Sequence, residues 1–119
     1  MSNPFSTQPI AEITVKELAQ LLQETPDDIQ FVDVREPPEL EIASLPGFQN
    51  LPLSEYAEWS GKIHTRLDVE KPTVVICHHG MRSAQMCHWL ISQGFVQVQN
   101  VAGGIDAYSR LIDPSVPRY

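Results

Sequence analysis

The stretch VVICHHGMRSAQ, residues 74–85, joins an apolar run to a cysteine, two histidines, a glycine and an arginine. The run that ends at Cys77 is rich in β-branched residues and too short for a helix, so it predicts a buried strand. After a short loop, apolar residues recur at helical spacing as far as Gly94, a residue type favoured just past a helix end. The stretch therefore predicts a strand, a loop that begins at Cys77 and a helix over residues 83–94.

Strand and helix patterns alternate along the rest of the chain as well. Thr14 and Glu17 have the spacing of a capping box and precede a helical pattern of about ten residues. Ser54 is a candidate N-cap for a later helix. Extended segments are predicted at residues 29–36, 48–53 and 95–101, and further helices at 38–43, 55–64 and 103–112.

This alternation favours an α/β fold in which helices cover both faces of a parallel sheet. At 119 residues the chain has the size of one compact domain. We expect residues 1–119 to form a single domain, with residues 1–9 and 113–119 as flexible or loosely packed tails.

Composition excludes several functional classes. Eight basic residues against fifteen acidic ones give a net charge of -7, which disfavours binding to nucleic acid or to anionic lipid. The sequence has no apolar run long enough to span a membrane and no basic, apolar start typical of a secretory signal. We therefore expect a cytoplasmic protein that binds neither nucleic acid nor membranes.

The loop after Cys77 has the features of an anion site. In open α/β sheets, ligands collect at the carboxyl ends of the strands, where this loop lies. Its backbone amides and the start of the next helix would together stabilise a thiolate or a small oxyanion. Gly80 would permit a positive φ, and Arg82 would add a permanent cation suited to oxyanions. A packed, unreactive cysteine is the bland alternative, and the combination favours a nucleophile.

Four segments in order resemble the rhodanese-like domain family, the sulfurtransferases. They are FVDVREPPEL at 31–40, LPGFQNLPL at 45–53, CHHGMRS at 77–83 and GFVQVQNVAGGIDAY at 94–108. The resemblance covers nearly the whole chain. It implies a small α/β domain with a mainly parallel five-stranded sheet and helices on both faces.

The resemblance also implies a mechanism. Cys77 would attack the outer sulfur of a small anionic donor such as thiosulfate, release sulfite and carry the sulfur as a persulfide. Cyanide or a protein or small-molecule thiol would then accept it. No metal or organic cofactor is implied, and we expect a monomer. The persulfide would be cradled by the loop residues His78, His79, Gly80, Met81, Arg82 and Ser83.

Two other functions remain as alternatives. Cysteine phosphatases and arsenate reductases related to this fold place five residues between the cysteine and the arginine, whereas only His78 to Met81 separate Cys77 from Arg82 here. A shorter loop closes a smaller ring of amides, which favours a single sulfur over a phosphoryl group. Rhodanese-like domains also serve as non-enzymatic regulatory or protein-binding modules, but these usually lack the cysteine that this chain keeps.

A metal site is not expected, although cysteine and histidine cluster in the sequence. Zinc needs four converging ligands, and adjacent His78 and His79 cannot readily point the same way. Cys87 falls on the buried stripe of its helix, where it is a small core residue or, as the alternative, a thiol that resolves oxidised Cys77.

Other polar residues receive supporting assignments. Asp33 and Arg35 end a strand on the side of the active loop, where an ion pair is the expected role, for example between Arg35 and Glu39. His78 and His79 are expected on the exposed rim, where they either attract anionic donors or are simply solvated.

Overall fold

The computed structural model describes residues 10–24 and 26–119 and contains a five-stranded sheet in the order β1-β5-β4-β2-β3. All strand pairs are parallel. The fold class predicted from the sequence is therefore confirmed. The strands are β1 (Glu12–Ile13), β2 (Gln30–Asp33), β3 (Gln49–Asn50), β4 (Thr73–Ile76) and β5 (Val98–Val101).

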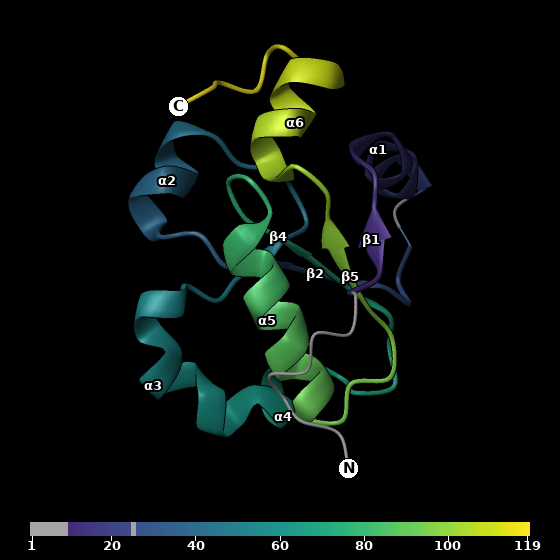
Figure 1. The fold of residues 1–119 in the computed structure, drawn as a ribbon, viewed down its shortest axis with the longest axis vertical. Coiled ribbons are helices and arrows are strands. Elements are labelled where there is room, and N and C mark those ends of the chain that lie inside the picture. The colour runs from purple at the N-terminus through teal and green to yellow at the C-terminus, as the bar shows by residue number, and fades with distance from the viewer. Residues whose placement is uncertain (1–9, 25) are drawn as a thin grey trace.

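Helices cover both faces of this sheet (Figure 1). Helices α1 and α6 lie on one face, and α5 lies on the other with the short helices α3 and α4. No helix in the described part of the chain has the length and apolar content needed to cross a membrane. The helices are α1 (Val15–Glu24), α2 (Pro37–Ile42), α3 (Tyr56–Trp59), α4 (Ile63–Arg66), α5 (Met81–Ser92) and α6 (Gly104–Leu111).

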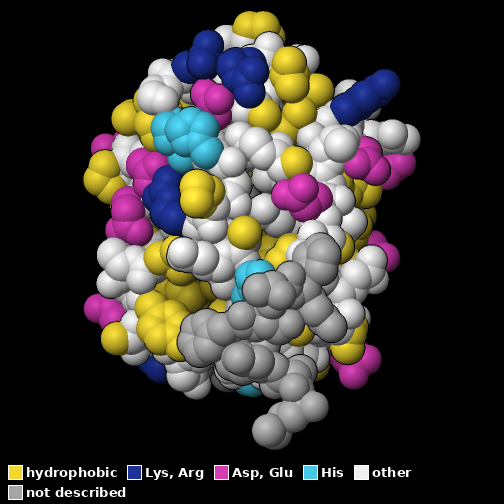
Figure 2. All heavy atoms as spheres, in the orientation of Figure 1, with side chains coloured by type: hydrophobic (Ala, Val, Ile, Leu, Met, Phe, Trp, Pro, Cys, Tyr) yellow, Lys and Arg dark blue, Asp and Glu magenta, His cyan; other side chains and the backbone are white. Residues whose placement is uncertain are grey.

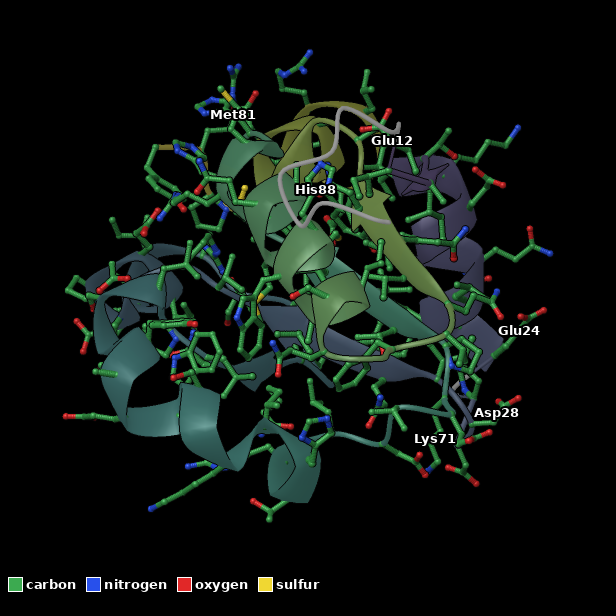
Figure 3. All side chains as sticks on the ribbon, turned by 60° about the horizontal axis from the view of Figure 1, so that its bottom comes forward. Glu12, Glu24, Asp28, Lys71, Met81 and His88 are labelled. Atoms are coloured by element: carbon green, nitrogen blue, oxygen red, sulfur yellow. The ribbon has the colours of Figure 1, made fainter. Side chains whose placement is uncertain are left out.

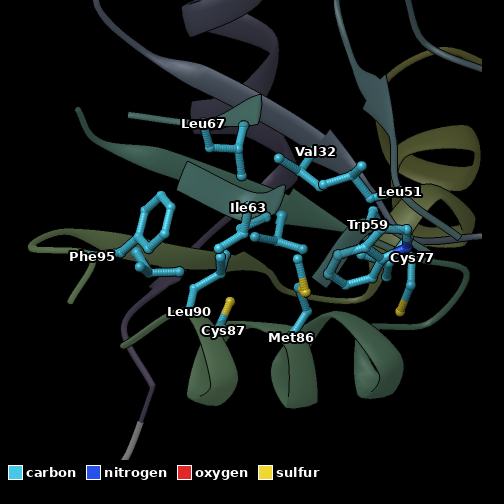
Figure 4. Close-up of a cluster of buried hydrophobic side chains, with 13 residues drawn as sticks. Val32, Leu51, Trp59, Ile63, Leu67, Cys77, Met86, Cys87, Leu90 and Phe95 are labelled. Carbon is cyan, nitrogen blue, oxygen red and sulfur yellow. The ribbon is translucent and has the colours of Figure 1, made fainter. Parts of the chain in front are cut away.

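The central strand β4 divides the core into two apolar clusters. Val74 and Ile76 pack toward α1 and α6, whereas Val75 and Cys77 pack toward α5. Figure 4 shows the second cluster, with Cys77 at one end of it. Because both faces of β4 are buried, the strand is continuously apolar in the sequence rather than alternating.

Several local predictions hold and two are wrong. The capping box is present, since the Thr14 and Glu17 side chains each accept the other's backbone N–H, at 3.1 and 3.0 Å. Helix α5 begins at Met81 instead of residue 83, because the preceding glycine adopts the left-handed conformation that allows an immediate start. Ser54 is no N-cap: it lies in the short 3-10 turn Leu53–Glu55 and its hydroxyl contacts Glu36.

The carboxyl-terminal segment 113–119 is mostly exposed, but Val116 and Tyr119 contact the rest of the domain. Val116 is buried, and its carbonyl accepts a hydrogen bond from the Ser109 hydroxyl at 2.5 Å. The Tyr119 ring stacks on His78, with ring centroids 3.9 Å apart. A buried valine and a stacked tyrosine anchor a segment whose prolines alone indicated a loose tail. The other predicted tail, residues 1–9, lies outside the described residues.

Candidate active site

Strand β4 delivers Cys77 to the carboxyl edge of the sheet, where the residue is only 1% exposed. The Gly80 backbone N–H donates a hydrogen bond to Cys77 Sγ at 3.1 Å, and Ser83 Oγ lies 3.2 Å from the same sulfur. Both donors come from the turn that joins β4 to α5 and from the first turn of that helix. One backbone amide and one hydroxyl of this region thus lie within hydrogen-bond distance of the sulfur.

The carbonyl groups of this loop point to a different partner. Cys77 O accepts a hydrogen bond from Ile105 N at 2.9 Å, and His78 O accepts one from Asp106 N at 3.0 Å. Both donors lie in the first turn of α6, where backbone N–H groups have no partner inside the helix. Helix α6 thus holds the loop by two of its carbonyl groups, while the Gly80 amide bonds the sulfur.

Two glycines make this arrangement possible. Gly80 has a φ of 103°, the left-handed region that glycine adopts without strain. Gly104 has a φ of 62°, and a Cβ there would lie 2.4 Å from His78 O and 2.5 Å from Cys77 O. The loop and α6 can approach each other this closely only with glycine at position 104.

The structure adds Asn100, which the sequence analysis missed. Its side-chain oxygen lies 2.5 Å from Ser83 Oγ, and its Nδ2 donates to Gly80 O at 3.0 Å. Asn100 is buried on β5 and pairs in register with Val75, which places it beside the end of β4. No clear signal for Asn100 is present in the sequence, because β5 reads Val-Gln-Asn-Val and the neighbouring Gln99 is polar as well.

Arg82 does not face an open anion site. Its Nη1 and Nη2 donate to the two carboxylate oxygens of Glu39 at 2.7 and 2.9 Å. This pairing lowers the pKa of Glu39 from 4.5 to about 2 and raises the pKa of Arg82. Tyr119 Oη also donates to Glu39, at 2.9 Å. The cation that the sequence assigned to an oxyanion is thus already paired within the protein.

Arg35 forms a different ion pair from the one predicted. Its Nη2 lies 2.8 Å from Asp33 Oδ2, and both side chains are buried. Arg35 Nη1 also donates to the backbone oxygen of Glu39 at 3.4 Å. The Glu39 carboxylate is instead bound by Arg82. Arg35 Nη1 also donates to Tyr119 Oη at 2.9 Å. The buried pair thus ties the end of β2 to α2 and to the carboxyl-terminal segment.

The two loop histidines have different environments. His79 is on the exposed rim, as expected, with 62% of its side chain accessible. His78 is instead partly covered by Tyr119, and its Nε2 is buried without a hydrogen-bond partner among the residues that the structure describes. Burial, together with the neighbouring His79, lowers the pKa of His78. His78 is therefore a neutral, packed group near neutral pH rather than a solvated cation.

The sequence-based reason against a metal site is wrong, because the two histidines do approach each other. One ligand atom each from His78, His79 and Asp106 lies within 4.8 Å of the others. However, Arg110 Nε and Arg118 Nε lie 3.0 and 3.5 Å from the Asp106 carboxylate. Figure 2 shows histidine and basic side chains gathered on this part of the surface around an acidic one. Two arginine cations oppose the binding of a metal cation here.

A family model of the rhodanese-like domain matches residues 14–111. The chain belongs to the rhodanese-like domain family. The deciding match spans the chain from α1 to α6, which includes Cys77 and its loop.

Two curated relatives and a solved structure illustrate the family. Rhodanese-like/PpiC domain-containing protein 12 of Arabidopsis thaliana, named as chloroplastic, is 48% identical over 94% of this chain but only 38% of that protein. A sulfurtransferase of Allochromatium vinosum is 35% identical over 85% of this chain and 90% of that protein. A single-domain sulfurtransferase of Saccharomyces cerevisiae has the same fold, with a TM-score of 0.78 at 21% identity, covering 94% and 98% of the two chains. The chain thus spans well under half the length of the Arabidopsis relative.

Two further residues of this rhodanese-like domain, Met81 and Cys87, differ in their exposure. Met81 opens α5 and is 79% exposed, and Figure 3 shows its side chain at the opposite end of the molecule from Lys71. Cys87 is fully buried between α5 and the sheet (Figure 4). Burial raises the pKa of the Cys87 thiol to about 12, so this cysteine is unreactive, in line with a core role.

Gly104→Ala is expected to loosen the loop from α6. The added Cβ would overlap two loop carbonyls, and the residue would be strained at its positive φ. We expect a loss of about 2 kcal/mol or more in the free energy of unfolding, measured by urea titration. Gly61→Ala is the matched control, because no atom lies within 4 Å of its Cβ position and its φ is not positive. Equal stability of the two variants would contradict this account.

Glu39→Gln is expected to change the acid dependence of stability. The folded-state pKa of Glu39 is below its unfolded value, so its contribution is present above about pH 4.5 and is lost as the pH falls toward 2. Urea titrations should therefore show a stability deficit of the variant at pH 7 that shrinks between pH 4.5 and 2. The control is Glu41→Gln, an exposed residue of the same helix. A deficit that stays constant with pH would contradict the role of the Arg82 pair.

Proposed function

We propose that this rhodanese-like domain is a sulfurtransferase that carries a sulfane sulfur as a persulfide on Cys77, with thiosulfate as a suitable donor. The observation that carries the proposal is the hydrogen bonding of Cys77 Sγ by the Gly80 amide and the Ser83 hydroxyl. Donors aimed at a sulfur at a strand end favour its anionic, nucleophilic form. The sulfurtransferase names of relatives such as the Allochromatium protein support the same chemistry.

The reaction has two balanced steps. In the loading step, the Cys77 thiolate attacks the outer sulfur of thiosulfate, and the sulfur–sulfur bond of the donor breaks with its electron pair leaving on sulfite. The negative charge then rests on the outer sulfur of the persulfide, near the loop amides. In the discharge step, a nucleophile such as cyanide attacks that outer sulfur. The Cys77–sulfur bond breaks, and its electron pair returns to Cys77 as the thiolate.

The contacts of Arg82 argue against a phosphatase or arsenate reductase. Those reactions need a cation and several amides around a tetrahedral oxyanion. Here the arginine is bound by both oxygens of Glu39, and only four residues separate it from Cys77. A single persulfide sulfur needs fewer donors, and the Gly80 amide and the Ser83 hydroxyl already lie at Cys77 Sγ. A purely protein-binding module would not need hydrogen-bond donors at the sulfur of a buried cysteine.

Cys77→Ser is expected to abolish sulfur transfer. Incubation of the unaltered chain with thiosulfate should add the mass of one sulfur atom, and cyanide should then release thiocyanate. The variant should show neither result, because a serine hydroxyl cannot form the persulfide. Cys87→Ser is the control and should keep both, since its thiol is buried and unreactive. Phosphatase turnover without thiocyanate, or a mass increase in Cys77→Ser, would contradict the proposal.

A further inference from the structure

The Ser83 hydroxyl has a single proton and two acceptors. Its oxygen lies 2.5 Å from Asn100 Oδ1 and 3.2 Å from Cys77 Sγ, with geometry that suits donation to either. Ser83 and Asn100 are 0% and 3% exposed. One hydroxyl can donate only one hydrogen bond at a time, so the two acceptors compete for it.

The orientation of the Asn100 amide is set by its other contacts. Nδ2 donates to Gly80 O at 3.0 Å and approaches Glu12 Oε2 at 3.5 Å. Both partners are acceptors only, so the amide nitrogen must face them and the amide oxygen must face Ser83. Asn100 Oδ1 is therefore a permanent acceptor beside the Ser83 hydroxyl.

Which of the two acceptors binds the Ser83 hydroxyl depends on the charge of Cys77 Sγ. When the sulfur is neutral, as in the thiol or the inner sulfur of a persulfide, the amide oxygen is the better acceptor and holds the proton of Ser83. When the sulfur is a thiolate, it is the better acceptor, because hydrogen bonds to charged groups are about twice as strong as neutral ones. The Ser83 hydroxyl then rotates and donates its hydrogen bond to Cys77 Sγ instead of Asn100 Oδ1.

We propose that Ser83 is a catalytic residue of the discharge step, which stabilises Cys77 as the leaving thiolate, and that Asn100 is its positioning residue. The proposal rests on the proposed function, because it assigns a group to one of its two steps. As the acceptor attacks the outer sulfur and the Cys77–sulfur bond breaks, negative charge grows on Sγ. The Ser83 O–H swings from Asn100 Oδ1 to Sγ, and no proton is transferred.

This assignment makes the two steps respond differently to loss of the hydroxyl. In discharge the hydrogen bond to Sγ is gained on the way to the transition state, so it accelerates the step. In loading the thiolate loses charge as it attacks, so the same bond is weakened and gives no acceleration. Ser83→Ala should therefore slow discharge while leaving loading by the thiolate form nearly unchanged.

The test uses Ser83→Ala in the full chain, with Cys87→Ser as the common background so that Cys77 is the only thiol. The pH midpoint of Cys77 alkylation by iodoacetamide should rise by about one unit, a tenfold change in thiolate stability. Discharge of the preloaded persulfide by cyanide should slow about tenfold in single-turnover measurements. Loading by thiosulfate, measured above the midpoint, should change less than about twofold. Ser83→Thr, which keeps the hydroxyl, should restore discharge.

Asn100→Ala is the second variant. Without the amide oxygen, a hydroxyl in the first turn of a helix can bond the carbonyl four residues earlier instead of the sulfur. We expect discharge about threefold slower, and no further loss when Asn100→Ala is added to Ser83→Ala, because the two residues act as one unit. Additive losses would overturn the positioning role.

Thr73→Val is the matched control, because it removes another buried hydroxyl at the far end of β4 and should leave both rates and the alkylation midpoint unchanged. An unchanged midpoint and discharge rate in Ser83→Ala, with normal thiocyanate release, would overturn this inference alone. Absence of a persulfide in the unaltered chain would instead overturn the proposed function. The alkylation midpoint needs no sulfur donor and would then still decide whether Ser83 stabilises the thiolate.

Discussion

The site depends on one constraint: the turn after β4 must present the Gly80 amide to the sulfur while carbonyl groups of the turn find partners elsewhere. Helix α6 supplies backbone N–H groups to Cys77 O and His78 O, and Asn100 supplies a side-chain N–H to Gly80 O. These partners are available because β5 pairs directly with β4 and leads into α6. The order of strands in the sheet therefore determines the polarity of the loop.

Local patterns in the sequence were enough to predict most of the elements but not their contacts. Runs of β-branched residues indicated β2, β4 and β5, whereas β1 is only two residues long and leaves no periodic signal. The capping box before α1 was predicted because its partners are three residues apart. Contacts across 43 residues, from Arg82 to Glu39, or across 84, from Arg35 to Tyr119, have no local signature. The residues that bond the sulfur were partly predictable, since they follow Cys77 in sequence, but Asn100 was not.

Ion pairs within the protein change the expected electrostatics of the loop. Arg35 pairs with Asp33, Arg82 pairs with Glu39, and two further arginines contact Asp106. Each cation near the loop thus has a carboxylate partner. The field that acts on Cys77 Sγ at hydrogen-bond distance therefore comes from a backbone amide and a hydroxyl rather than from an unpaired cation. Such a field suits one anionic sulfur atom better than a large, highly charged oxyanion.

In the proposed sulfur transfer, the burial of Cys77 would make the two steps unequal in the size of the partner that they admit. The Cys77 residue is 1% exposed, so in this proposal a donor would have to present its reactive sulfur at the end of a slim group, as thiosulfate does. Loading extends the side chain by one sulfur–sulfur bond of about 2 Å and brings the reactive atom that much closer to the surface. A bulkier acceptor, including a thiol on another protein, could then reach the outer sulfur of the persulfide. A donor of the same size could not have reached Cys77 in the loading step. The geometry of the loop is therefore more selective for the donor than for the acceptor.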